Sequence, residues 1–270
     1  GNDGYKLSKS RGNYTDPNEV MDKFSADAER FLLLSSPVMN AEDFSLQDKD
    51  VSDVNRKLSM IWNMYDFFTM YAEVDGWEFK GELKDPLEGL TNPLDIWVVS
   101  RVHQLTAHID EQMQQYDLPS AVKPILEFID DASNWYVRRS RKRFWKSEDD
   151  ADKNDAYKTL HYVLVRLSMI MAPFTPFLAE ELYQKLTGGE SVHLLDWPEN
   201  GLSVRAEHGL KVRQPLASAT LRGSYKDFEP ELLEIVKEEL NIKEVTVSDK
   251  QVKPEKTFLE NWEEGNISQH

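Results

Sequence analysis

The sequence predicts a mainly α-helical fold: an antiparallel helix bundle, preceded by a loop-helix linker and followed by a small α/β unit. Between about residues 52 and 171, apolar residues recur at steps of three and four through three stretches of about twenty residues or more. The connections between these stretches are mostly short, which favours antiparallel neighbours. After Gly189 the pattern changes to short alternating runs around one acidic helix, typical of a separate small unit.

The linker comes first, over residues 1–45. Asp16 followed by Pro17 is a helix start, because Asp caps a helix and Pro is tolerated at its first position. The helical pattern is interrupted near Ser25, and residues 27–34 are expected to form a second short helix. The opening residues carry no Met and lead directly into a motif-bearing loop, so we expect a fragment of a longer protein.

The bundle follows, over residues 46–200. Pro93 starts one of its helices, Pro124 is tolerable near the first turn of another, and Gly188 ends the last. The expected helices cover residues 52–71, 93–113, 120–145, 152–171 and 177–186. In the third unit, residues 201–270, we expect strands at 216–221 and 245–247 around a helix at 229–239, after a short extended piece at 192–195.

Composition excludes several classes of protein. Among 270 residues, 32 Lys and Arg face 48 Asp and Glu, a net charge of −16, so any contact with nucleic acid must be local. The absence of cysteine excludes disulfides, thiolate catalysis and Cys-based zinc sites. We find no apolar run long enough to span a membrane and no secretory leader, and we expect a cytoplasmic protein with no membrane partner.

The first candidate site is a loop with two lysines and two serines. The residues are Lys6, Ser8, Lys9 and Ser10, next to Gly12. Two ammonium groups and two hydroxyl donors suit a polyphosphate whose negative charge grows during reaction. The alternative is an ordinary solvated loop, and the pattern alone does not decide between them.

The second candidate site is the strongly basic patch near the end of the third long helix. Arginine pairs with phosphates and base edges, and aromatic rings stack on unpaired bases, so the segment suits single-stranded RNA. The alternative is that its bases neutralise acids at 148–152 and that its tryptophans lie in the core. The candidate RNA-binding residues are Trp135, Arg138, Arg139, Arg141, Lys142, Arg143 and Trp145.

Other titratable residues carry weaker signals. His103 and His108 are five apart and do not share a helical face, and no metal-ligand spacing appears, so we predict no metal site. Asp130 and Asp131 are adjacent on a helix and point about 100° apart, which argues against a catalytic pair.

Together these segments resemble the class I aminoacyl-tRNA synthetases, and among them the isoleucyl enzymes. KLSKSRGN is similar to the family's second ATP motif, with Leu7 in place of the usual Met. Further segments occur in the family's order, namely DPNEVMDKFSADAERFLLLSS, LDIWVVSRVHQL, NWYVRRSRKRFW, APFTPFLAEELYQKL, SVHLLDWPE and KVRQPLA. Arg138 and Arg139 after the Trp-Tyr pair look isoleucyl, although valyl and leucyl enzymes share parts of the pattern.

The resemblance implies a function for each region. In a full-length parent that uses ATP and Mg²⁺ to activate isoleucine, Lys6 and Lys9 would stabilise charge on the phosphates, with Ser8 and Ser10 as supporting donors. The bundle would bind the anticodon of tRNA(Ile). The family's other ATP motif, His-x-Gly-His, is absent, so we expect the fragment alone to be inactive and to bind no cofactor. A non-catalytic helical module, whose basic patch docks an acidic protein, remains the rival interpretation.

Overall fold

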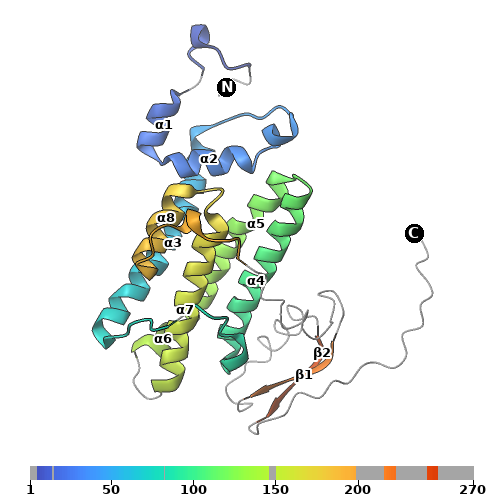
Figure 1. Ribbon diagram of the computed structural model, residues 1–270. Coiled ribbons are helices and arrows are strands. Elements are labelled where there is room, and N and C mark those ends of the chain that lie inside the picture. Colours follow the sequence, from blue (N-terminus) through green and yellow to red (C-terminus); the bar gives the residue numbers. More distant parts are fainter. Residues whose placement is uncertain are drawn as a thin grey trace, which may run out of the picture.

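The computed structural model describes residues 5–13, 15–81, 83–145, 150–198, 216–222 and 242–248. Long helices lie side by side in a bundle, with the N-terminal helices at one end of it (Figure 1). This arrangement confirms the predicted mainly α-helical bundle. Within the described residues, no helix has both the length and the apolar character that crossing a membrane requires. The helices are α1 (Pro17–Lys23), α2 (Ala26–Leu34), α3 (Asp48–Asp75), α4 (Pro93–Gln114), α5 (Leu118–Asp130), α6 (Arg138–Trp145), α7 (Asp150–Met171) and α8 (Pro176–Thr187).

The first linker helix begins at its predicted cap, and the second begins directly after the predicted break near Ser25. The Asp16 carboxylate accepts a hydrogen bond from the backbone N–H of Asn18 at 2.9 Å, which starts α1. The Ser25 hydroxyl accepts from the N–H of Ala28 at 3.0 Å, which starts α2. Phe31 is fully buried and belongs to the same hydrophobic core as the bundle. The linker is therefore packed onto the bundle.

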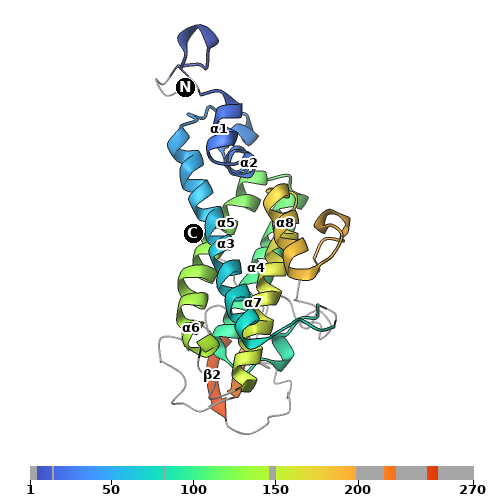
Figure 2. The same cartoon turned by 90° about the vertical axis from the view of Figure 1, so that its left-hand side faces the viewer.

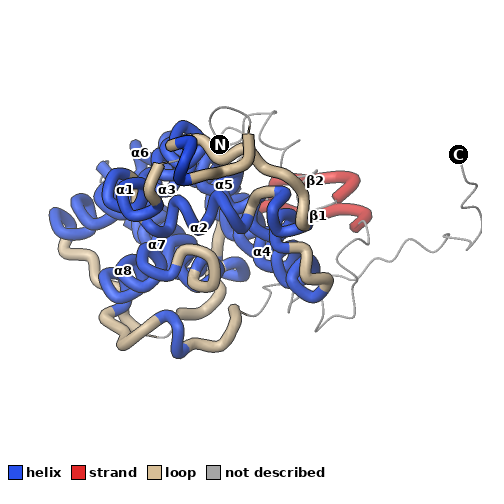
Figure 3. The backbone as a smooth tube through the Cα atoms, turned by 90° about the horizontal axis from the view of Figure 1, so that it is seen from above, coloured by secondary structure: helices blue, strands red, loops and turns tan. Residues whose placement is uncertain are grey.

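Four long helical segments form the body of the bundle: α3, α4, the continuous segment from α5 to α6, and α7. Seen from above, they surround one shared hydrophobic core (Figure 3). α3 is longer than its apolar pattern predicts, at 28 residues, because its first turn carries Asp48 and Asp50, which favour a helix N-terminus. It ends at Gly76, whose φ of 63° suits glycine. The centre of the core is fully buried and apolar, and includes Ile61, Val102, Ile125, Val163, Leu164 and Leu167.

The third long segment was expected as one α-helix and instead contains a π-helical stretch, η4 (Asp131–Val137), between α5 and α6. Five of the buried residues of this segment fall at steps of four. In a straight α-helix with 3.6 residues per turn, four such steps would rotate the buried face by about 160°. The wider π turns absorb this drift and keep one face against the core. The residues of that face are Phe128, Ala132, Tyr136, Ser140 and Phe144.

Pro124 lies inside α5 and cannot donate the hydrogen bond that the Ser120 carbonyl would normally accept. His108 of α4 replaces that donor, because its Nε2 lies 3.0 Å from the Ser120 oxygen. The helix therefore continues through Pro124 with its carbonyl satisfied by a neighbouring helix.

The segment at 192–195, expected to be extended, is instead a turn of 3-10 helix, η5 (Val192–Leu194). The Glu180 carboxylate of α8 accepts from the Ser191 hydroxyl at 3.0 Å and from the Val192 N–H at 2.9 Å, which draws the chain back and buries Val192. The predicted strands are present as β1 (Leu216–Arg222) and β2 (Ile242–Ser248), paired in parallel. The helix expected at 229–239 lies outside the described residues.

Candidate functional site

Two candidate regions lie at opposite ends of the bundle. We call residues 5–13 the Lys-Ser loop and residues 135–145 the basic segment. In both side views α1 and the loop that precedes it lie at one end, and α6 lies at the other (Figures 1 and 2). The 22 residues of α7 alone account for a length of about 33 Å between the two ends.

The basic segment presents most of its cations to solvent. Ser140 and Phe144 are buried and hold one face of α6 against the bundle. On the other faces Arg138, Arg139, Arg141 and Lys142 are exposed, and the Trp145 ring is 57% exposed. Arg138, Arg141 and Lys142 make no ion pair with any side chain that the structure describes. The surface of α6 is thus a basic strip with one exposed aromatic ring.

Trp135 is placed differently from Trp145. Its ring is half-buried, and the Arg139 guanidinium lies 3.8 Å from the ring centroid. This cation–π contact orients Arg139 and covers the ring of Trp135. Of the two tryptophans predicted at this site, Trp145 is therefore the one that offers an open face.

Arg143 lies inside the bundle, although the sequence placed it among the candidate RNA-binding residues. Its Nη1 and Nη2 donate to the two carboxylate oxygens of Asp95 at 2.8 and 2.7 Å, and its Nε donates to Asp152 at 2.8 Å. The Tyr136 hydroxyl also donates to Asp95, at 2.7 Å. Asp95 is completely buried. The guanidinium is used by the fold and is not available at the surface.

The electrostatics of this buried cluster follow from its contacts. Burial by itself lowers the pKa of Arg143, but hydrogen bonds and attraction to Asp95 outweigh burial and raise the pKa. Burial, and then the Asp95 charge, raise the pKa of Tyr136 well above 10.0. Both groups keep their protons throughout the physiological pH range. The sequence offered the alternative that basic residues here neutralise acids further along the chain. This holds for Arg143, which pairs with Asp152. Residues 146–149 lie outside the described part.

The Lys-Ser loop is a tight turn held by local hydrogen bonds. The backbone N–H groups of Arg11 and Gly12 donate to the Ser8 carbonyl at 3.1 Å, forming η1 (Lys9–Arg11). The Ser8 and Ser10 hydroxyl oxygens lie 2.8 Å apart. Lys6 is exposed, while the side chain of Lys9 lies outside the described part. The turn brings the predicted hydroxyl donors together.

Asn13 is the loop residue to which the sequence pattern assigned no role. Its side chain is 8% exposed, although most of the loop is exposed. Its Oδ1 accepts from the Ser8 N–H at 2.9 Å, and its Nδ2 donates to the Lys6 carbonyl at 3.1 Å. Nothing in the sequence signals this burial, because the partners are backbone atoms.

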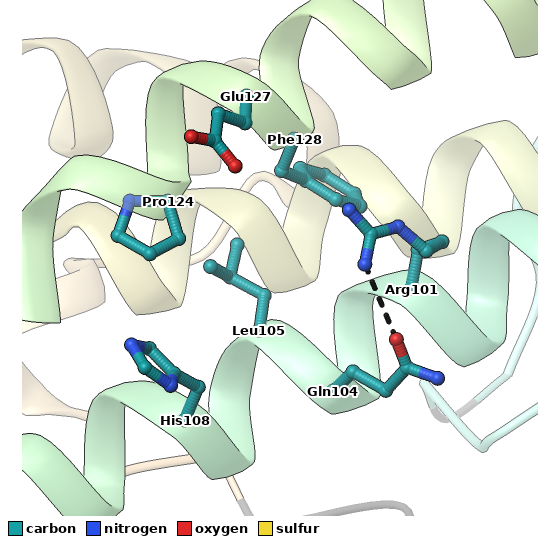
Figure 4. A pocket seen from close by; sticks show the side chains of 7 residues that line it. All are labelled: Arg101, Gln104, Leu105, His108, Pro124, Glu127 and Phe128. Atoms are coloured by element: carbon teal, nitrogen blue, oxygen red, sulfur yellow. Dashed lines mark hydrogen bonds between the residues drawn. The ribbon is translucent and has the colours of Figure 1, made fainter. Parts of the chain in front are cut away.

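A groove between α4 and α5 is lined by seven residues (Figure 4). Three of its four polar side chains have partners within the bundle: Arg101 pairs with Asp131 at 3.0 Å and donates to Gln104 at 3.2 Å, and His108 bonds to the Ser120 carbonyl. The neighbouring Asp130 pairs with Lys57 of α3, whereas Asp131 pairs with Arg101 of α4, so the two adjacent carboxylates bind different helices. Arg101, Gln104 and His108 of this groove are therefore used by the fold. Its lining consists of Arg101, Gln104, Leu105, His108, Pro124, Glu127 and Phe128.

The histidines that the sequence left as structural also have partners. His103 Nε2 lies 2.9 Å from the Tyr162 hydroxyl and 3.2 Å from Asp85, which ties the α3–α4 connection to the bundle. In the part of the chain that the structure describes, no three His, Asp or Glu side chains converge on a possible metal position.

Comparisons with known proteins agree with this geometry. Residues 95–244 match the family described as the anticodon-binding domain of tRNA ligase, and residues 1–45 match class I tRNA synthetases (I, L, M and V). An isoleucine–tRNA ligase of Treponema denticola is 39% identical over 92% of this chain, and one of Chlamydia trachomatis is 41% identical over 90%. The chain spans 26% of the length of each.

A solved structure supports the same fold. It is the LeuRS of an Agrobacterium radiobacter ternary complex with tRNA and LeuAMS, with a TM-score of 0.56 and 17% sequence identity. The match covers 87% of this chain and 27% of that one. The helical bundle, the order of its segments and the family match over more than half of the chain lead to one conclusion. The chain belongs to the anticodon-binding domain family of tRNA ligases.

Proposed function

We propose that this chain is the Lys-Ser-loop and anticodon-binding part of an isoleucine–tRNA ligase, and that its basic segment binds the anticodon stem and loop of tRNA(Ile). The observation that carries the proposal is the exposed basic strip of α6, in a protein whose net charge is −16. Isoleucine as the amino acid is supported by the relatives, which are about 40% identical and carry that name. Such a protein works in the cytoplasm, where tRNA is charged.

Within the bundle, Arg138, Arg139, Arg141 and Lys142 contact phosphates or base edges in this proposal, and Trp145 stacks on an unpaired base. Trp135 supports the strip by holding Arg139. Arg143 contributes through the fold alone.

In the full-length ligase, the Lys-Ser loop acts on ATP. Isoleucine attacks the α-phosphate of Mg²⁺-bound ATP, the acyl-adenylate forms, and pyrophosphate leaves. Lys6 and Lys9 stabilise the negative charge on the phosphates in the transition state, and Ser8 and Ser10 donate hydrogen bonds. The acyl group then passes to the terminal ribose of the tRNA.

A binding titration tests the RNA part of the proposal. At low salt, the chain should bind isoleucine tRNA more tightly than valine tRNA, and affinity should fall steeply as salt rises. The double change Arg138→Glu and Arg139→Glu should remove this preference. Lys158→Glu, at an exposed lysine outside the basic segment, is the control and should leave it intact. Equal or absent binding of both tRNAs would contradict the proposal.

Pyrophosphate exchange tests the loop. In the full-length ligase that contains this chain, Lys9→Ala should lower kcat for ATP–pyrophosphate exchange by roughly a hundredfold, as expected when one transition-state contact is lost. An unchanged exchange rate would contradict the role assigned to the loop.

A further inference from the structure

We infer that Asn13 is a positioning residue for amino-acid activation, and that it acts by tying the end of the Lys-Ser loop to residues 6–8, the segment that carries Lys6 and leads directly into Lys9. This inference rests on the proposed function of the loop and adds a residue to it. Asn13 is assigned no contact with ATP. Its effect on the reaction passes through the backbone that holds the lysines.

The geometry is that of a clamp. The Asn13 amide uses both of its ends, accepting from the Ser8 N–H at 2.9 Å and donating to the Lys6 carbonyl at 3.1 Å. These two atoms flank Leu7, so the amide fixes the peptide planes on both sides of that residue. Gly12, with a φ of 59°, lets the chain turn back so that Asn13 can face Lys6.

Apart from the Arg11 guanidinium, which lies 4.8 Å from the Tyr5 ring centroid, the contacts recorded in the described part of the loop are hydrogen bonds, and its apolar side chains are exposed. Tyr5 is 64% exposed and Leu7 is 49% exposed, whereas Asn13 is 8% exposed. The two hydrogen bonds together hold the short turn against fluctuation. The loop is therefore ordered mainly by polar contacts, and the buried amide makes two of them.

The consequence for catalysis follows from the need for orientation. A displacement of about 1 Å in a group that contacts the transition state can cost about a hundredfold in rate. Without the clamp, Lys6 and Lys9 would sample many positions around the phosphates. We expect Asn13→Ala to lower kcat for ATP–pyrophosphate exchange about 10- to 100-fold. The KM for isoleucine and the Kd for tRNA should stay within about twofold, because neither ligand is assigned to this loop.

The test is a double-mutant cycle in the full-length ligase that contains this chain. Asn13→Ala, Lys9→Ala and the double variant are compared in exchange assays. Asn18→Ala, at an exposed asparagine in the neighbouring helix α1, is the control and should keep the parent rate. If Asn13 acts by placing both lysines, the loss in the double variant should be clearly smaller than the product of the two single losses, because without the Lys9 side chain only the effect through Lys6 remains.

Each outcome decides something. An unchanged rate in Asn13→Ala, together with a slow Lys9→Ala enzyme, would overturn the inference and leave the proposed function standing. Unchanged rates in both would remove the proposed role of the whole loop. Fully multiplicative losses in the double variant would show that Asn13 does not act through Lys9. A loss of tRNA affinity or a lower melting temperature in Asn13→Ala would mean a general role in folding, and would also overturn the inference.

Discussion

The two candidate regions hold their cations in opposite ways. The basic segment lies on a helix whose inner face is fixed by Phe144 and by the buried pair of Arg143 and Asp95. The Lys-Ser loop has no such anchor, and its described contacts are mainly local hydrogen bonds around Ser8 and Asn13. The basic segment is therefore a rigid surface. The loop is a small turn that is held by hydrogen bonds between its own residues.

The comparison also separates two uses of arginine within one helix. Arg143 is buried and bonded to two carboxylates, whereas Arg139, four residues earlier, lies on the surface over Trp135. The same residue type serves folding in one place and is available for binding in the other. Which use applies is decided by the direction in which the side chain leaves the helix.

The largest effect should come from breaking the anchor of the basic segment. Asp95→Ala leaves the Arg143 charge and the Tyr136 hydroxyl buried without their main partner, and should lower the free energy of unfolding by about 3–5 kcal/mol. Urea unfolding measures this. Asp53→Ala removes an exposed partner of Arg56, at 3.7 Å, and should change stability by no more than about 0.5 kcal/mol. Equal effects of the two variants would contradict the assignment of the anchor.

The next effect concerns RNA binding by the rigid surface. Trp145→Ala should weaken tRNA binding by about 1–3 kcal/mol, or roughly 5- to 150-fold in Kd, because one stacking ring is lost. Trp145→Phe should recover most of the affinity. Phe177 is also highly exposed, at 69%, but lies in α8, outside the basic segment; Phe177→Ala should leave Kd unchanged. Equal losses from both alanine variants would argue against stacking at Trp145.

The pH dependence should distinguish the bundle from the loop. Burial lowers the pKa of His161 below its usual 6.5, so below about pH 6.5 the unfolded chain takes up a proton that the folded chain does not. The free energy of unfolding should therefore fall as the pH falls through this range, by at most about 1.4 kcal/mol per pH unit for each such histidine. Residues 5–13 contain no His, Asp or Glu.

Urea unfolding at pH 7.5, 6.5 and 5.5 measures this slope. His161→Gln keeps a donor for the Leu186 carbonyl, to which His161 Nε2 lies at 3.1 Å, but cannot be protonated in this range. That variant should show a shallower slope below pH 6.5. A slope as steep as that of the parent would show that His161 is not responsible.

The smallest effect should be confined to the end of the bundle that carries the loop. Asp16→Ala removes the cap of α1 and should destabilise that helix by about 1 kcal/mol. Hydrogen exchange of the α1 amides should then be about fivefold faster, while tRNA binding and exchange in α6 stay unchanged. Faster exchange in α6 would mean that the two ends are coupled more strongly than their contacts indicate.

Patterns along the chain were sufficient for most elements of the bundle. Caps at Asp16 and Ser25, the glycine at 188 and the strands at 216 and 245 follow from residues that are neighbours in sequence. The exposure of Arg139 and Lys142 and the partial burial of Trp135 also agree with the helical spacing. These features depend on interactions between residues that are close in the sequence, and such interactions can be predicted from the sequence.

Local patterns failed where a distant residue supplied the partner. The extended piece expected at 192 is instead a helical turn because Glu180 of another element accepts from the Ser191 hydroxyl and from the Val192 N–H. The π-helical stretch arises because five buried residues at steps of four must all face the same core. Arg143 is not part of the candidate RNA surface, because Asp95, 48 residues earlier in the sequence, lies beside it in the fold and binds its guanidinium.

The sequence alone therefore determined the helical class, the order of the segments and the two regions that carry positive charge, because periodicity and capping are local. Only the tertiary structure decided that Arg143 of the basic segment pairs with Asp95 inside the bundle, and only it revealed the Asn13 clamp. Those outcomes depend on backbone and carboxylate partners that the fold brings together, and a buried charge or amide is stable only where such partners meet it.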